Sequence, residues 1–125
     1  MRAAHFIVAA IAASGAWACA PEIGDSCTGA LDCAVDGTRV CDSTQEGGYC
    51  LVPACRPDEC PEEAVCVQFG ELERARTFCM RHCGSEGDCR GGYSCVSPGD
   101  LSLATAIVDE DPRGSKFCME DLPTE

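Results

Sequence analysis

Residues 54–80 read ACRPDECPEEAVCVQFGELERARTFCM and hold four cysteines. Side chains alternate in VCVQ (65–68) and again in TFCM (77–80), which predicts the two short strands of a hairpin. Residues 70–76 between them mix acidic and basic side chains, and we expect an exposed hairpin tip or a short helical turn there. A two-stranded hairpin is only marginally stable alone, and the core is too small to stabilise it. We therefore expect cross-links to stabilise the hairpin.

The same arrangement of cysteines and flanking residues recurs on both sides of this stretch. An acid precedes the second cysteine of each group (Asp32, Glu59, Asp88), an aromatic residue precedes the fourth (Tyr49, Phe78, Phe117), and Leu51, Met80 or Met119 follows it. We interpret this pattern as a threefold internal repeat. The three groups are Cys27, Cys33, Cys41 and Cys50; Cys55, Cys60, Cys66 and Cys79; and Cys83, Cys89, Cys95 and Cys118.

The repeat predicts a small disulfide-rich fold of three tandem four-cysteine units. We expect each unit to be a short β-hairpin with irregular loops and little helix, over residues 27–51, 52–80 and 81–125. Thirteen cysteines in 125 residues support this class. Chains poor in large apolar side chains usually depend on disulfides, each of which contributes about 2–4 kcal/mol.

The amino-terminal sequence MRAAHFIVAAIAASGAWA (1–18) is typical of a secretory signal peptide. A basic start is followed by eight apolar residues (6–13) and then by small residues that end in an A-x-A cleavage site. Eight residues are too few to cross about 30 Å of hydrocarbon as a helix. We therefore expect cleavage before Cys19 and an extracytoplasmic protein.

Cys19 is the cysteine that the three groups leave over. Removing it leaves twelve cysteines, an even number that can all pair. Residues 16–19 (AWAC) resemble a bacterial lipobox, in which the cysteine at the new amino terminus is lipidated. The resemblance implies lipidation at Cys19, a spacer over residues 19–26 and membrane attachment through acyl chains. Ordinary secretion with a spare thiol at Cys19 remains the alternative.

Cysteine spacing alone leaves three possible pairings in each group. The cysteine spacing of each group resembles that of the first four cysteines of an epidermal-growth-factor-like module, although the fourth lies further from the third, and that resemblance implies first-to-third and second-to-fourth pairing. The whole arrangement also resembles the cysteine-rich predicted lipoproteins of myxobacterial type, with a lipobox, a short acidic spacer and repeats with DC, GYxC and FCM signatures. No chemistry is assigned to that family.

The composition argues against several classes of function. A net charge of −12 offers no basic patch for nucleic acid. The sequence has no C-x2-C pair, the spacing typical of zinc and redox sites. The closest match is Cys79 and Cys83, with three residues between them. One histidine, His82, and no identifiable nucleophile predict no enzyme activity. The acids at 109–111 lack the spacing of a calcium loop and are better interpreted as solvated. No metal and no cofactor are expected.

The loop between Cys95 and Cys118 is the place where a binding site is most plausible. Its apolar residues Leu101, Leu103, Ile107 and Val108 predict either a cover over a small core or an apolar binding patch. Residues 101–103 alternate like a strand, whereas residues 103, 104, 107 and 108 fit one helical face.

These observations predict a non-catalytic binding or structural module at the bacterial envelope. It would be anchored in a membrane through Cys19 and would display its loops to an unidentified protein partner. The alternative is a secreted cysteine-rich inhibitor or effector that presents a stapled loop to another protein.

Overall fold

The computed structural model describes residues 20–34 and 37–121, and the predicted signal peptide and Cys19 lie outside these residues. The described chain is small and mostly β, and its four helical segments are 3-10 turns of three residues each. This confirms the predicted disulfide-rich fold class with little helix. In order, the elements are η1 (Ala30–Asp32), β1 (Val40–Cys41), β2 (Cys50–Pro53), β3 (Ala64–Phe69), η2 (Leu72–Arg74), β4 (Arg76–Arg81), η3 (Glu86–Asp88), β5 (Tyr93–Val96), η4 (Pro98–Asp100), β6 (Thr105–Ile107) and β7 (Phe117–Glu120).

Strands β3 and β4 form the predicted central hairpin. They pair antiparallel over six residues each, from Ala64 opposite Arg81 to Phe69 opposite Arg76. The tip between them contains η2, so the prediction of an exposed tip and that of a short helical turn are both correct. Val65 and Val67 are fully buried, and their neighbours Ala64 and Cys66 are buried as well, so this part of β3 is covered on both faces.

A five-stranded antiparallel sheet, in the order β1-β2-β4-β3-β6, runs through all three cysteine groups. Strand β2 of the first group pairs with β4 of the second, and β6 of the third group pairs with β3. Strands β5 and β7 form a separate two-stranded sheet. The predicted boundaries at 51/52 and 80/81 therefore divide the sequence but cut through one continuous network of strands.

Six disulfides join the first cysteine to the third and the second to the fourth in each group. This is the pairing that the resemblance to epidermal-growth-factor-like modules implies. In every group the third and fourth cysteines lie opposite each other on neighbouring antiparallel strands, and each bridges back to the loop that precedes the hairpin. The disulfides are Cys27–Cys41, Cys33–Cys50, Cys55–Cys66, Cys60–Cys79, Cys83–Cys95 and Cys89–Cys118.

The core combines a few large side chains with disulfide sulfur. Its main cluster takes residues from all three groups, and a second cluster consists of Cys27, Cys33 and Cys50. Six disulfides around so small a core indicate a chain that folds in an oxidising, extracytoplasmic environment. The fully buried residues with the largest side chains are Tyr49, Phe117, Ile23, Val65 and Val67.

Residues 20–26 are built into the fold, which corrects the prediction of a spacer over 19–26. Ile23 is 0% exposed, and its backbone N–H donates to Glu63 Oε1 at 3.2 Å. The Gly24 N–H donates to the Cys50 carbonyl oxygen at 2.8 Å. The spacer prediction overlooked Ile23. Burying one isoleucine side chain stabilises a fold by about 1.5–3 kcal/mol, which is a large contribution in a core with few large apolar side chains.

Arg90 connects the third cysteine group to the first through hydrogen bonds. Its guanidinium donates to the carbonyl oxygens of Gly24 at 2.9 Å and Glu46 at 2.7 Å, and also to that of Gly48. The same group lies 4.3 Å from the centre of the Tyr93 ring, a cation–π contact. Five donors in one planar fork let a single arginine satisfy several carbonyl groups at the junction.

Candidate functional site

The four predicted binding residues do not form one exposed patch. Leu101 and Ile107 pack against the main core, and Val108 is half-buried with its N–H donating to the Cys66 carbonyl oxygen at 3.0 Å. Only Leu103 remains largely exposed, at 53%. Most of this loop therefore covers the core, which is the first of the two predicted roles.

The helical interpretation of residues 103–108 is wrong. Thr105–Ile107 forms the edge strand β6, with Ile107 opposite Val67 of β3. The reason is that β3 would otherwise be an edge strand with unpaired backbone groups, and pairing with β6 satisfies them. Helical spacing in a stretch this short is a weak signal next to a strand edge that needs a partner.

Leu103 contributes to a shallow groove beside the tip of the β3–β4 hairpin. We call this surface the hairpin-tip groove. Its apolar members come from the ends of both strands, from η2 and from the segment before β6, and charged side chains of both signs surround them. Its lining residues are Phe69, Gly70, Glu71, Leu72, Arg74, Arg76, Phe78, Ser102, Leu103 and Ala104.

Leu72 is the most exposed large apolar residue in the described chain, at 93%. Its φ of +53° lies in the left-handed region, which is uncommon for a residue with a side chain. Such a conformation costs of the order of 1 kcal/mol, and an exposed leucine adds no burial in return. Backbone strain combined with apolar exposure makes this residue a candidate contact site.

The backbone around Leu72 is firmly held. The Gly70 N–H donates to the Ala104 carbonyl oxygen at 2.8 Å, which ties the tip to the loop before β6. The Arg76 guanidinium donates to the carbonyl oxygens of Glu73 and Ala75 at 3.1 and 3.0 Å. A loop that is already ordered loses little entropy when it meets a partner.

Sequence reasoning found the exposed tip at 70–76 but did not single out Leu72. The available signal was its position, as one apolar residue between the acids Glu71 and Glu73 in a predicted turn. A leucine there cannot serve the alternating pattern of either strand. The hydrogen bond between Gly70 and Ala104 joins the tip to a distant segment of the sequence, and no local pattern reveals that.

The acids at 109–111 do not all behave as solvated side chains. The Asp109 carboxylate accepts hydrogen bonds from the backbone N–H groups of Asp58 at 2.7 Å and Cys66 at 2.9 Å. In return, the Asp58 carboxylate accepts from the N–H groups of Glu110 at 3.3 Å and Asp111 at 3.2 Å. We call this reciprocal arrangement the Asp58–Asp109 clasp. It holds the long third-group loop against the second group, and the carboxylate oxygens accept hydrogen bonds from backbone N–H groups.

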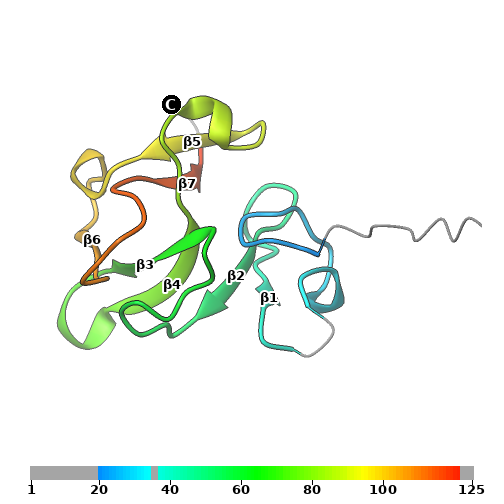
Figure 1. Ribbon diagram of the computed structural model, residues 1–125, viewed down its shortest axis with the longest axis horizontal. Helices are drawn as coiled ribbons and strands as arrows, with labels where there is room; N and C mark the ends of the chain where they lie inside the picture. Colours follow the sequence, from blue (N-terminus) through cyan, green and yellow to red (C-terminus); the bar gives the residue numbers. More distant parts are fainter. Residues whose placement is uncertain (1–19, 35–36, 122–125) are drawn as a thin grey trace, which may run out of the picture.

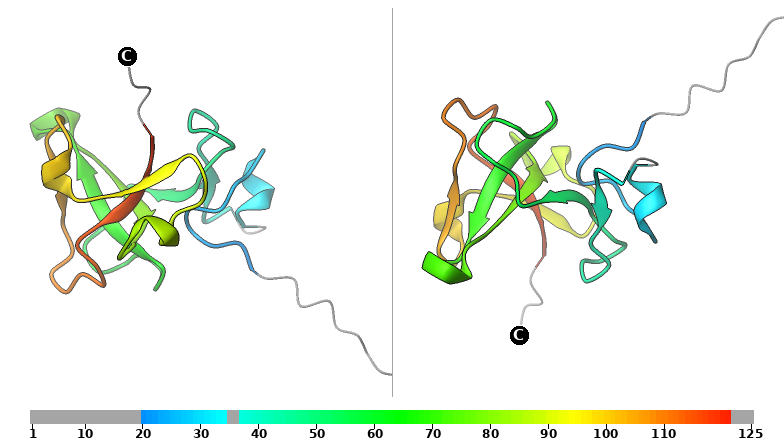
Figure 2. Two further views of the ribbon diagram at one scale, coloured as in Figure 1. Left: turned by 90° about the horizontal axis from the view of Figure 1, so that it is seen from above. Right: turned by 90° about the horizontal axis from the view of Figure 1, so that it is seen from below.

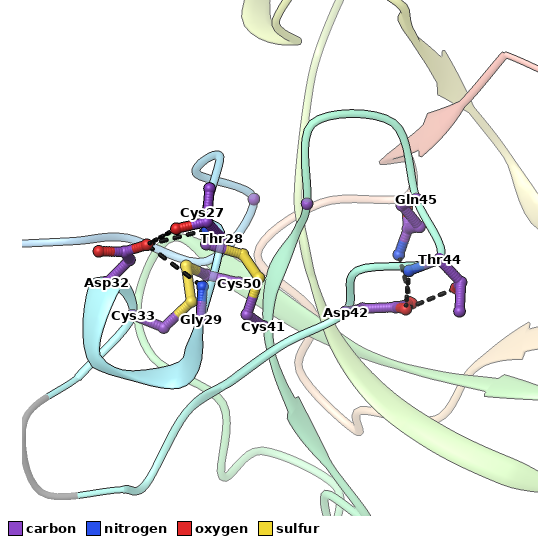
Figure 3. The surroundings of a disulfide bond; sticks show 12 residues. Cys27, Thr28, Gly29, Asp32, Cys33, Cys41, Asp42, Thr44, Gln45 and Cys50 are labelled. Atoms are coloured by element: carbon purple, nitrogen blue, oxygen red, sulfur yellow. Dashed lines mark hydrogen bonds between the residues drawn. A yellow bond between two sulfur atoms is a disulfide. The ribbon is translucent and has the colours of Figure 1, made fainter.

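The acid before the second cysteine folds back on its own loop in two of the three groups. Asp32 Oδ2 accepts from the N–H groups of Thr28 at 2.8 Å and Gly29 at 3.2 Å (Figure 3). Asp88 does the same with the residues that follow Cys83, which are Gly84 and Ser85. These hydrogen bonds hold the pKa of both carboxyl groups below its usual value. Both carboxylates cap the turn that follows the first cysteine of their group.

The cysteines that the zinc interpretation used belong to two different disulfides, since Cys79 bonds Cys60 and Cys83 bonds Cys95. Three sets of neighbouring cysteine sulfurs lie within 4.8 Å of one another, and every one is part of a disulfide. Cysteine binds a metal ion as a free thiolate, and sulfurs in disulfides do not supply one. His82 lies with Nε2 3.2 Å from the Glu62 carbonyl oxygen, so its ring contacts backbone.

The fold and its surfaces define a class: a small β protein stapled by disulfides, with a rigid groove at a hairpin tip. Comparison of the chain with protein-family models, curated proteins and solved structures finds no match. Within residues 20–34 and 37–121, no helix has the length and apolar character needed to cross a bilayer.

Proposed function

We propose that this chain is an exported, lipid-anchored, non-catalytic module that holds the hairpin-tip groove away from a membrane for a protein partner. The observation that carries the proposal is the pairing of the twelve cysteines from Cys27 to Cys118. That pairing leaves Cys19 as the odd cysteine, directly after a signal-peptide pattern and within a lipobox-like sequence.

The arrangement of the chain suits such a role. The segment that begins at residue 20 and the η1 turn lie at one end of the longest axis, and η2 lies at the other (Figures 1 and 2). A protein held at its amino-terminal end therefore projects the hairpin-tip groove outward. The disulfides Cys55–Cys66 and Cys60–Cys79 hold the middle of the β3–β4 hairpin, which supports the shape of the groove at its tip.

A second candidate function is a secreted inhibitor or effector that inserts the tip into another protein. Leu72 favours it, because a leucine at 93% exposure on a pinned hairpin is a shape that a pocket can receive. The two candidates share the contact surface and differ in the anchor. Mild salt would release the effector from membranes, whereas only detergent would release the anchored form.

Intact mass of the protein purified from its native membrane tests the anchor, before and after reduction and thiol alkylation. We expect a diacyl or triacyl increment at Cys19 and twelve alkylated cysteines that appear only after reduction. A mature form without the increment would overturn the anchored proposal. Free thiols without reductant would overturn the six-disulfide framework.

The contact surface is tested separately, with a photo-cross-linking side chain at Leu72 and a matched one at Thr28, which is exposed in another loop. We expect a discrete adduct with one envelope protein from position 72 only. Equal cross-linking from both positions would show that the hairpin tip has no special role.

A further inference from the structure

A second exposed apolar surface lies beside the point where the described chain begins. Leu31, in the η1 turn, is 76% exposed. It lines a shallow depression together with small apolar residues from the first described positions and from the end of η1. We call this surface the anchor-proximal face, and its residues are Ala20, Pro21, Leu31, Cys33, Ala34, Thr38 and Arg39.

The local structure forces Leu31 outward. Its neighbour Asp32 is held to the Thr28 and Gly29 backbone, and Cys33 is buried at 1% exposure by its disulfide to Cys50 (Figure 3). With Cys33 fixed inside, a 3-10 turn with three residues per turn cannot direct Leu31 inward as well. The geometry of the turn therefore leaves the Leu31 side chain exposed at the surface.

The position of the predicted anchor indicates what covers this face. Under the proposed function, Cys19 carries the acyl chains, and it directly precedes Ala20, which itself lines the face. Consecutive Cα atoms are about 3.8 Å apart, and the next residue, Pro21, is held by the Arg39 guanidinium. No flexible spacer separates the acylated residue from the folded body, so this face has to lie at the bilayer surface.

We infer that the anchor-proximal face docks on the lipid bilayer that holds Cys19, with Leu31 in the interfacial layer. This inference rests on the proposed function. Apolar side chains beside an anchor enter about 5–10 Å into the headgroup and acyl boundary. The net charge of −12 does not attract the rest of the protein to anionic lipid, so the anchor and this face decide the orientation. The hairpin-tip groove then faces away from the membrane.

Tryptophan fluorescence tests the orientation, because the only tryptophan of the chain, Trp17, precedes Cys19. Leu31→Trp and the matched variant Leu72→Trp each give a single reporter in the mature, lipidated protein. Both are bound to phosphatidylcholine vesicles whose acyl chains carry bromine, a quencher. We expect a blue shift and a loss of fluorescence for Leu31→Trp, and neither for Leu72→Trp.

The outcomes separate the inference from the proposed function. Vesicle flotation and a lipid mass increment, followed by equal quenching of both reporters or stronger quenching of Leu72→Trp, would overturn the docking inference and leave the anchor intact. A protein that carries no lipid and does not float would overturn the proposed function itself. If Leu31→Trp fails to form its six disulfides, hydroxyl-radical oxidation of the wild-type protein on vesicles replaces it. Protection of Leu31 with modification of Leu72 supports the inference, and equal modification overturns it.

Discussion

The Tyr49 hydroxyl donates a hydrogen bond of 3.0 Å to the carbonyl oxygen of Cys118, a residue 69 positions further along the chain. The Tyr49 hydroxyl oxygen in turn accepts a hydrogen bond of 3.0 Å from the backbone N–H of Arg81. Tyr49 belongs to the first cysteine group, Arg81 ends strand β4 of the second group's hairpin, and Cys118 belongs to the third group. One buried phenol therefore joins distant parts of a chain in which each disulfide stays within its own group.

Removing this hydroxyl is expected to weaken the junction between the groups. Tyr49→Phe keeps the ring in the core but leaves a backbone donor and a backbone acceptor unpaired, at a cost of roughly 1–3 kcal/mol in the free energy of unfolding. Guanidinium unfolding with the disulfides intact measures it. Tyr93→Phe is the matched control, because Arg90 still donates to the Glu46 carbonyl oxygen that Tyr93 loses. Equal losses in the two variants would contradict the special role of Tyr49.

The ionisation of Tyr49 should also set an alkaline limit to stability. Burial raises the pKa of Tyr49 from 10.0 to about 12. Above pH 10 the unfolded phenol loses its proton while the folded one keeps it, so the stability that this group contributes is complete below pH 10 and is lost as pH rises toward 12. Phenolate absorbance of Tyr93→Phe, recorded in a rapid pH jump, isolates Tyr49. Ionisation at the usual pKa of a free tyrosine would contradict its burial.

At low pH, the turn-capping aspartates Asp32 and Asp88 should contribute to the loss of stability. Backbone N–H donors hold the pKa of Asp32 and Asp88 below 3.8, so their contribution to stability is complete above that pH and is lost as pH falls through the lowered values. In the double variant Asp32→Ala with Asp88→Ala, we expect a shallower acid-induced loss of stability. Glu86→Ala, a change to an exposed acid beside Asp88, serves as control. An unchanged acid profile in the double variant would show that the caps carry no pH dependence.

The Asp58–Asp109 clasp gives a prediction about the long third-group loop. Asp109→Ala removes the acceptor of the Asp58 N–H and of the N–H of Cys66, a fully buried residue. We expect a loss of about 1–3 kcal/mol in the free energy of unfolding. Amide hydrogen exchange should accelerate at Cys66. Glu110→Ala changes an exposed neighbour and should stay within about 0.5 kcal/mol of the wild type. A similar effect of both substitutions would mean that the clasp does not hold the loop.

The sequence predicted this fold as far as its local patterns extend. Alternation around Cys66 and Cys79 located the central hairpin, and the mixed charges at 70–76 located its tip. The pairing of the groups into one sheet was out of reach, because β2 and β6 reach β4 and β3 through contacts between groups. Burial of Ile23 was missed for the same reason: one isoleucine in a polar segment carries no periodic signal, and only the completed core shows what it fills.

The candidate surfaces were predicted less well than the fold. Of the four residues predicted for an apolar patch, only Leu103 is largely exposed, and the other three turn toward the core or the sheet. The exposure of Leu72 and Leu31 was not predicted, because each is a single leucine in a short polar turn. Their exposure follows from neighbours that are fixed elsewhere, such as Cys33 by its disulfide and Gly70 by its hydrogen bond to Ala104.

Gly48 provides the sharpest test of the packing in the first group. A Cβ at this position would lie 2.0 Å from the Cys27 carbonyl oxygen, and φ is +76°. Gly48→Ala therefore has to displace the backbone next to the Cys27–Cys41 disulfide, and we expect a loss of more than about 1 kcal/mol and a lower yield of correctly paired protein after oxidative refolding. Gly87→Ala is the matched control, because a Cβ there meets nothing within 4 Å. Peptide mapping of the disulfides in both variants gives the yield. Equal yields would show that the Gly48 turn and Cys27 are not packed as closely as this structure has them.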